Sequence, residues 1–322
     1  MRMTTLFALA LAAVTPAAAQ DVFPSKTVVI MVPFAPGGST DLVARLTAEV
    51  MTRALGQTVI VENVTGAGGT IASSKLAQAN ADGYTLMVHH VGLSSAATLY
   101  RNLKYDTKTA FQPLGVLTHT ASVFIARPDF PANTFGELIA YVRQNKDKVT
   151  LGNAGLGAAS HLCGMLFQTA VGQQVTTVPY RGNAPVLNDL RGKQIDMTCD
   201  QATGVSGPIK EKVIKAYAVT TTRRIADFPD LPTADESGLK GFDLSVWHGI
   251  YAPKGLPQPV LDKLAAAVQA TVKDPVFIER LKGINTAAAS PEEATPAGLT
   301  RMLHSEVDRW APIIKAAGQY AD

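Results

Sequence analysis

Short glycine-containing loops repeatedly connect an apolar, strand-like segment to a helical pattern, and this constrains the fold more than any other feature of the chain. The first unit runs from a β-branched stretch at residues 27–32, through Pro36-Gly37-Gly38, into a helical pattern that Gly56 ends. Such alternation predicts an α/β fold, in which parallel sheets carry helices on both faces.

The same alternation continues along most of the sequence. Further strands are predicted at residues 59–61, 84–89, 122–126, 149–152, 175–179, 195–199, 216–220 and 244–251. Helices are predicted at 71–79, 134–144, 158–171 and 184–190, with mainly helical structure from residue 260 to 314. A chain of 322 residues suggests two domains, and the Pro- and Gly-rich stretch 227–241 is the best candidate for a return between them.

The first residues predict a signal peptide. Arg2 gives a positive start, residues 4–14 form an apolar run, and Ala17-Ala18-Ala19 supply the small residues of a cleavage site. The run is too short to cross a bilayer, which takes about 20 residues. The alternative is an amphipathic or buried helix. We expect cleavage after Ala19 and export of the mature protein.

Charge and cysteine usage narrow the class further. Lys and Arg number 29 against 26 Asp and Glu, with no long run of one sign, which argues against a nucleic-acid partner. In an oxidising compartment the two cysteines, Cys163 and Cys199, favour a disulfide over two buried free thiols. Neither their spacing nor nearby histidines predict a metal site.

Catalytic and cofactor motifs are missing. The sequence has no Gly-x-Ser-x-Gly elbow, no Gly-Lys-Ser/Thr phosphate loop and no His-Glu-x-x-His helix, and residues 66–69 lack dinucleotide-site spacing. His89 and His90 are adjacent on a predicted strand, so they point to opposite faces and cannot share a metal ion. We predict no catalytic residue, no metal and no cofactor.

Three glycine loops open helices in one way, at residues 36–41, 66–70 and 153–157. Helix N-termini carry unpaired N–H groups that bind carboxylates or phosphates, and glycine lets the backbone approach a ligand. Ordinary caps and turns explain any single loop. The three together predict a cleft for a small anion, beyond the carboxyl ends of the strands.

Three side chains are candidates for contacts in this cleft. Arg181, at a strand-to-helix turn, can pair bidentately with a carboxylate or be a solvated surface residue. Asp200 ends a buried strand and can accept hydrogen bonds from a ligand or from groups that close the domains, or cap a helix. His248 either lines the cleft or is only half-buried.

The ordered blocks of sequence at these loops resemble the substrate-binding proteins of tripartite tricarboxylate transporters, the Bug (TctC-like) family. The resemblance spans essentially the whole mature chain, and its blocks are Val32-Pro33-Phe34-Ala35-Pro36-Gly37-Gly38-Ser39-Thr40-Asp41, Glu62-Asn63-Val64-Thr65-Gly66-Ala67-Gly68-Gly69, Asp82-Gly83-Tyr84, Asn153-Ala154-Gly155, Ser160-His161-Leu162, Val178-Pro179-Tyr180-Arg181-Gly182, Leu231-Pro232-Thr233 and Ala252-Pro253-Lys254-Gly255.

The resemblance implies a periplasmic-binding-protein fold of two lobes that close on a ligand by a hinge, each lobe a mainly parallel sheet flanked by helices. Residues 20–122 and 230–322 would form lobe 1, and residues 123–229 lobe 2. It also implies a monomeric periplasmic receptor that captures a small carboxylate and delivers it to membrane transporter subunits. An exported enzyme acting on a small carboxylic acid, with His90, His248 or Asp200 as acid or base, is the alternative, and a structural envelope protein is a third reading.

The family pattern also implies a site. Two glycine loops of the first lobe would grip one carboxylate, and the second lobe would add polar contacts. The residues expected to bind the ligand are Phe34, Ala35, Ser39, Thr40, Gly69, Thr70, His90, Asn153, Ser160, Arg181, Asp200 and His248. The imidazoles at His89-His90 and His248 depart from the family pattern, which suggests a flatter or larger acid, such as an aromatic carboxylate, and a dependence on pH.

Overall fold

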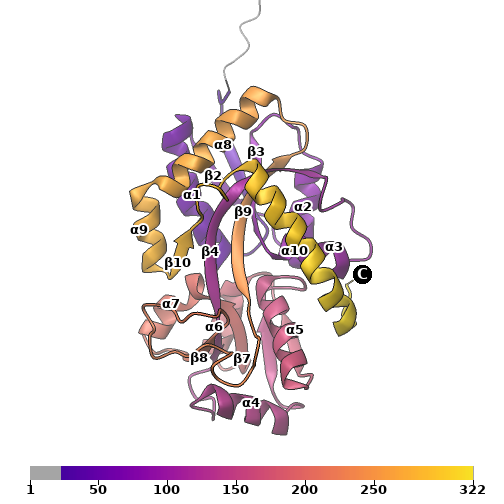
Figure 1. Cartoon of the computed structure of the whole chain (residues 1–322), viewed down its shortest axis with the longest axis vertical. Helices are drawn as coiled ribbons and strands as arrows, with labels where there is room; N and C mark the ends of the chain where they lie inside the picture. The colour runs from indigo at the N-terminus through magenta and orange to yellow at the C-terminus, as the bar shows by residue number, and fades with distance from the viewer. Residues whose placement is uncertain (1–22, 322) are drawn as a thin grey trace, which may run out of the picture.

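The computed structural model describes residues 23–321, so the predicted signal peptide, residues 1–19, lies outside the described residues (Figure 1). The strands are β1 (Val28–Val32), β2 (Val59–Asn63), β3 (Thr85–His90), β4 (Phe111–Ala126), β5 (Thr150–Asn153), β6 (Thr176–Pro179), β7 (Met197–Gln201), β8 (Lys215–Val219), β9 (Ser245–Pro253) and β10 (Thr286–Ala288). The helices are α1 (Ser39–Leu55), the 3₁₀ turn η1 (Ala67–Gly69), α2 (Thr70–Ala77), α3 (Gly92–Leu99), α4 (Phe135–Gln144), α5 (Ala159–Val171), α6 (Asn183–Arg191), α7 (Ala202–Lys210), α8 (Gln258–Lys273), α9 (Pro275–Gly283) and α10 (Pro296–Ala317).

The strands form one sheet with the order β2-β1-β3-β9-β4-β7-β5-β6, and β8 and β10 also pair with β4. Strand β1 is parallel to β2 and β3, and β5 is parallel to β6 and β7. Strands β9 and β4 join the two groups by antiparallel pairing. The predicted α/β fold is therefore confirmed, while the centre of the sheet is antiparallel.

Strand β4 is shared by two lobes. Its residues 111–121 pair with β9, and Ser122 to Ala126 pair with β7. Figure 1 shows β4 and β9 along the middle, with α1–α3 and α8–α10 around the upper, first lobe and α4–α7 around the lower, second lobe. The sequence predicted only residues 122–126 as strand, because Pro113 and Gly115 interrupt the β pattern where the register shifts.

The chain crosses between the lobes again beside β4. Thr220 N donates to Ser122 O at 2.9 Å, and Leu244 N donates to Thr220 O at 2.8 Å. The Thr220 hydroxyl accepts from Ser122 N at 2.9 Å and is 2.7 Å from Leu244 O, and Thr220 is fully buried. Three segments far apart in sequence are thus tied together at the junction of the lobes.

Two short helices, α3 and α7, were not predicted from the sequence. Helix α7 contains two glycines and Pro208, which lower helix propensity, and α3 consists largely of small residues with no polar face. Both helices begin directly after a strand, at the interface between the lobes. The N-terminus of α7 belongs to the site described below.

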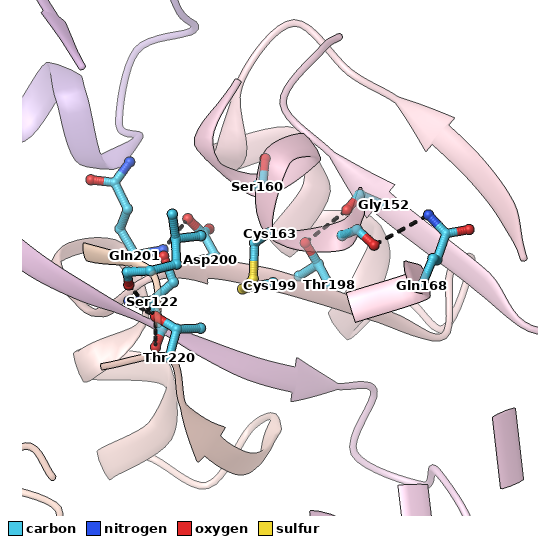
Figure 2. Close-up of a disulfide and its surroundings, with 12 residues drawn as sticks. Ser122, Gly152, Ser160, Cys163, Gln168, Thr198, Cys199, Asp200, Gln201 and Thr220 are labelled. Carbon is cyan, nitrogen blue, oxygen red and sulfur yellow. Dashed lines mark hydrogen bonds between the residues drawn. A yellow bond between two sulfur atoms is a disulfide. The ribbon is translucent and has the colours of Figure 1, made fainter. Parts of the chain in front are cut away.

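The predicted disulfide is confirmed. Cys163 on α5 bonds to Cys199 on β7, with their Cα atoms 6.0 Å apart and both residues fully buried (Figure 2). The bond fastens a helix of the second lobe to the strand that ends at Asp200 and Gln201. It thereby holds β7, whose end lies at the cleft, against α5.

Candidate ligand-binding site

The loop between β1 and α1 is held by a buried carboxylate. Asp41 Oδ2 accepts hydrogen bonds from Gly37 N at 2.9 Å and Arg45 Nε at 2.8 Å, and Oδ1 accepts from Asn63 Nδ2 at 2.9 Å. The Asn63 amide also donates to Phe34 O. Burial alone would raise the pKa of Asp41, but the hydrogen bonds from Arg45, Gly37 and Asn63 lower it. The loop is thus preformed.

The second loop of the first lobe touches the second lobe directly. A Cβ on Gly68, where φ is +58°, would lie 1.7 Å from Leu156 O, so no other residue fits there without moving the loops apart. Tyr100 donates from its hydroxyl to the same carbonyl at 2.9 Å. The lobes therefore meet backbone to backbone at this point.

The first loop makes a similar contact with the turn before α6. Ala35 N donates to Arg181 O at 2.9 Å, and a Cβ on Gly182 would lie 2.6 Å from Ala35 N. A Cβ on Gly204, in the first turn of α7, would lie 2.7 Å from Ser39 Oγ. The N-termini of α1, α6 and α7 are thus brought together across the cleft.

Helix capping differs between the cleft and the rest of the protein. Helices α1, α2, α5, α6 and α7 begin at the cleft, and none has a side-chain cap within the described residues. Helices α4, α9 and α10 begin elsewhere and are capped by Thr134, Asp274 and Thr295. Helices α3 and α8 also lack a side-chain cap. The N–H groups of five cleft helices are left for other acceptors, which is what an anion site requires.

A cavity of about 790 Å³ opens between the lobes. Pro33 and Phe34, which lead into the first glycine loop, line it with residues 65–68 of the second loop and with Ala154, Gly155 and Leu156 of the second lobe. Among its described lining residues Arg181 carries the only charge, and its side chain is exposed. A guanidinium at the mouth of a cleft can pair with an anionic ligand.

Three buried imidazoles, those of His89, His90 and His248, lie behind the first loop. The ring centroids of His89 and His90 are 5.1 Å apart and both rings contact Phe34, so the expectation that these side chains point to opposite faces is wrong. Strand β3 ends at His90, where the regular alternation of a strand no longer holds. The His90 ring stacks on Phe34 with centroids 4.7 Å apart, and His248 lies between the hydroxyls of Thr118 and Thr40, at 2.9 and 3.3 Å. Burial lowers the pKa of His90 to about 3 and those of His89 and His248 well below the ordinary value. All three are therefore neutral at pH 7 and titrate only in acid.

Asp200 is a buried acid whose pKa is raised, whereas the pKa values of the three histidines are lowered. It is 1% exposed at the end of β7, and its Oδ1 accepts from Gln201 N at 2.6 Å and from the Asn183 amide. Its Oδ2 has no hydrogen-bond partner. Burial raises the pKa of Asp200 to about 7, against the smaller effect of the Gln201 N–H.

Several predicted ligand residues already hold their own loops. Asn153 Oδ1 accepts from Gly155 N, Ser160 Oγ accepts from Ala154 N, and Thr70 donates to Ala67 O. Direct contacts of these side chains with a ligand stay predictions. Of the predicted set, Phe34 and Arg181 line the cavity. The other members are not among its lining residues, and of these Ser39, Thr40, His90, Asp200 and His248 are buried.

The sequence analysis missed five cavity residues with large side chains: Ile71, Tyr100, Leu156, Tyr180 and Tyr320. Tyr180 directly precedes Arg181 in the block Val178-Pro179-Tyr180-Arg181-Gly182, so the sequence could have indicated it as a site residue. Tyr100 and Tyr320 lie far apart in sequence and come together only because Tyr100 and Ala321 form an isolated bridge. The Asp41–Asn63 contact was also missed, since 22 residues separate the two side chains.

Two lobes that share strands and enclose a cleft of loops and helix N-termini define the class of solute-binding proteins that close around a ligand. The tripartite tricarboxylate transporter family receptor profile, TctC, matches residues 43–319. The chain belongs to this family.

Individual relatives support the assignment. A UPF0065 protein from the TAR-I ttuE-ttuC' intergenic region of Agrobacterium vitis is 46% identical over 94% of this chain and 88% of its own. The structure of the periplasmic binding protein BugD is 47% identical, with a TM-score of 0.91 and coverage of 93% and 100%. MatC of Rhodopseudomonas palustris with bound malate is 36% identical, with a TM-score of 0.88 over 91% of this chain and 100% of MatC.

Between residues 23 and 321 no helix is both long and apolar enough to cross a membrane. The same residues contain no group of three or more His, Cys, Asp or Glu side chains placed to hold a metal ion.

Proposed function

We propose that this receptor works in the periplasm, binds a small carboxylate between its lobes without converting it, and delivers it to the membrane subunits of a tripartite transporter. The observation that carries the proposal is the set of uncapped helix N-termini from both lobes that face one another at the cleft. Arg181 adds a cation at the mouth. Two relatives of known structure were solved with acids, MatC with malate and Rpa4515 of R. palustris with adipate.

The lobes are proposed to open and close about the segments at Ser122, Thr220 and Leu244. Residues 233–242 contact the second lobe, because Ala234 N donates to Val219 O and the Phe242 ring packs 5.5 Å from Phe124. We therefore place the second crossing at Leu244 instead of residue 229. A ligand that contacts both lobes stabilises the closed form in proportion to its preference for that form.

Thermal unfolding of residues 20–322 with a panel of aliphatic and aromatic carboxylates tests this function. A ligand at 100 times its Kd adds about 2.7 kcal/mol to stability, so a true ligand raises the Tm in a saturable way. Arg181→Ala should weaken that ligand about tenfold, since a charge-assisted hydrogen bond is worth roughly 1.5–3 kcal/mol. Arg191→Ala, an exposed change at the far end of α6, is the matched control.

Two results would contradict the proposal. If no acid of the panel shifts the Tm, the cleft does not bind carboxylates. If the bound acid is recovered chemically altered after long incubation, the alternative of an exported enzyme gains support, and His90, His248 and Asp200 become the residues to substitute.

A further inference from the structure

A second cavity, of about 800 Å³, lies at the hinge and shares no lining residue with the cavity between the glycine loops. We call it the hinge cavity. The loop after β8, at residues 221–227, lines it from the second lobe, and α9 and β10 line it from the first. Residues 119–121 of β4 and Ser245 of β9 line it beside the crossings at Ser122 and Leu244. The hinge cavity is therefore shared by both lobes and by the strands that join them.

The two lobes touch beside this cavity. Thr203 Oγ1 of α7 is 2.7 Å from Thr286 Oγ1 of β10, and Asn285 Nδ2 donates to Ser206 Oγ at 2.8 Å. Figure 1 shows α9 and β10 of the first lobe above α7 of the second, at the left of the junction. Because these contacts join different lobes, the shape of the cavity depends on how the lobes are placed relative to one another.

Apolar side chains make up much of the lining. A volume of about 800 Å³ lies within the range of about 300–1,000 Å³ that is typical of ligand pockets. An apolar group that leaves water for such a surface is stabilised by the hydrophobic effect. The apolar side chains that line the cavity from both lobes and from β4 include those of Ala121, Ile225, Val272, Ile278 and Ala288.

The charged side chains of the lining leave an excess of positive charge. Arg223, in the second lobe, forms no ion pair between residues 23 and 321, and Lys282, in the first, has only exposed Glu279 at 3.9 Å. A guanidinium or ammonium without a close partner can pair with an anion. The other charged lining residues have partners, since Arg224 pairs with Glu236 at 3.0 Å, Asp227 with Lys210 at 2.9 Å and His119 with Glu293 at 3.1 Å.

We propose that the hinge cavity is a second ligand site, which binds a small monoanion with an apolar body and thereby favours the closed arrangement of the lobes. The anionic group pairs with Arg223 or Lys282, and the apolar body packs on the aliphatic lining. Binding at this site does not depend on what the cleft binds.

The preference for closure follows from the state in which the cavity is formed. The lobes of this structure meet at the cleft, where Ala35 N donates to Arg181 O at 2.9 Å. A ligand that fits the hinge cavity in this arrangement, and contacts both lobes, stabilises this arrangement over the others. It should therefore also help the cleft to hold its own ligand, because the coupling between two sites is reciprocal.

Calorimetric titration of residues 20–322 with octanoate tests the site. Octanoate should bind saturably, because it combines an anionic group with an apolar chain. Acetate lacks the chain and octanol lacks the charge, so each should bind at least about tenfold more weakly than octanoate.

Variants assign the binding to the hinge cavity. Arg223→Ala combined with Lys282→Ala should weaken octanoate at least about tenfold, and Ala287→Trp, at an exposed position of the lining, should do so by filling the cavity. Arg191→Ala combined with Lys146→Ala removes the same charge from exposed positions outside the cavity and should leave the affinity within about twofold. Thermal unfolding confirms that each variant is folded.

A third pair of variants tests the link to closure. A Cβ on Gly68 would lie 1.7 Å from Leu156 O and hold the lobes apart, whereas one on Gly56, at a similar φ of +66°, meets open space. Octanoate should therefore bind at least about threefold more weakly to Gly68→Ala than to Gly56→Ala. Equal affinities would overturn the preference for the closed arrangement.

The remaining outcomes separate the hinge site from the cleft. If octanoate does not bind, or if the hinge variants bind it as wild type does, the second site is overturned and the carboxylate function of the cleft stands. If Arg181→Ala weakens octanoate while the hinge variants do not, the acid occupies the cleft, which supports the cleft function and overturns the inference. Failure of the earlier carboxylate panel alone would leave the hinge site intact.

Discussion

Asp41 in the first lobe and Asp200 in the second are both buried aspartates beside helix N-termini, yet their partners differ. Asp41 accepts hydrogen bonds from Gly37, Arg45 and Asn63, and these lower its pKa. Only Oδ1 of Asp200 accepts hydrogen bonds, from the neutral Asn183 amide and from Gln201 N. Burial raises the pKa of Asp200. The first carboxylate is built to be ionised without a ligand.

This difference shows that the two lobes contribute to the cleft in different ways. The first lobe supplies a preformed loop, in which the charge needed to shape the backbone is already compensated. The second lobe keeps a buried acceptor uncompensated, at a cost to the free protein.

The largest expected effect comes from removing the uncompensated charge. Because the pKa of Asp200 rises from 3.8 to about 7 on folding, its contribution to stability is present below pH 3.8 and is lost as pH rises to about 7. Asp200→Asn should therefore stabilise the ligand-free protein at pH 8, by up to about 4 kcal/mol, and change little near pH 4. Urea unfolding at both pH values measures this. A variant less stable than wild type at pH 8 would show that Asp200 is compensated in the fold.

The matching change at Asp41 should have the opposite sign. Asp41→Asn loses the ion pair with Arg45 and weakens the hydrogen bonds that hold the first loop, so we expect a loss of about 2 kcal/mol at pH 7. Urea unfolding checks the value, with Asp230→Asn expected within about 0.5 kcal/mol of wild type. Equal stabilities for Asp41→Asn and wild type would remove the contrast between the two aspartates.

The smallest change in stability is expected for Gly68→Ala, which should also hinder closure of the two lobes. Gly68→Ala places a side chain against Leu156 O and in left-handed backbone geometry, which alone costs roughly 1–2 kcal/mol. Gly56→Ala has a similar φ of +66° in open space, so it carries the strain without the clash. We expect similar Tm values for both variants but at least tenfold weaker ligand binding for Gly68→Ala alone. Equal affinities would mean that the lobes need not meet at this point.

Much of the fold could be predicted from local pattern. Strands such as 28–32 and helices such as 39–55, ended by Gly56 in left-handed geometry, follow directly from periodicity and capping. The first part of β4 could not be predicted, because Pro113 and Gly115 are unfavourable in a strand and the pairing with β9 that stabilises it is not visible in the local sequence. Short, glycine-containing α7 is likewise stabilised by its position between β7 and α1.

The site was predictable in its backbone and less so in its side chains. The glycine loops and Arg181 are visible as sequence blocks, whereas the state of Asp200 depends on which groups other segments bring to it. Asn183 lies 17 residues away, and Ser39 comes from the other lobe. Sequence alone therefore named Asp200 as a candidate but left open whether it caps a helix or faces a ligand.

A crystal structure with the tightest-binding acid tests the central claim most directly. The account predicts the carboxylate between the lobes, accepting hydrogen bonds of about 3 Å from backbone N–H groups of residues 33–41 or 66–70. An acid bound outside the cleft would contradict it.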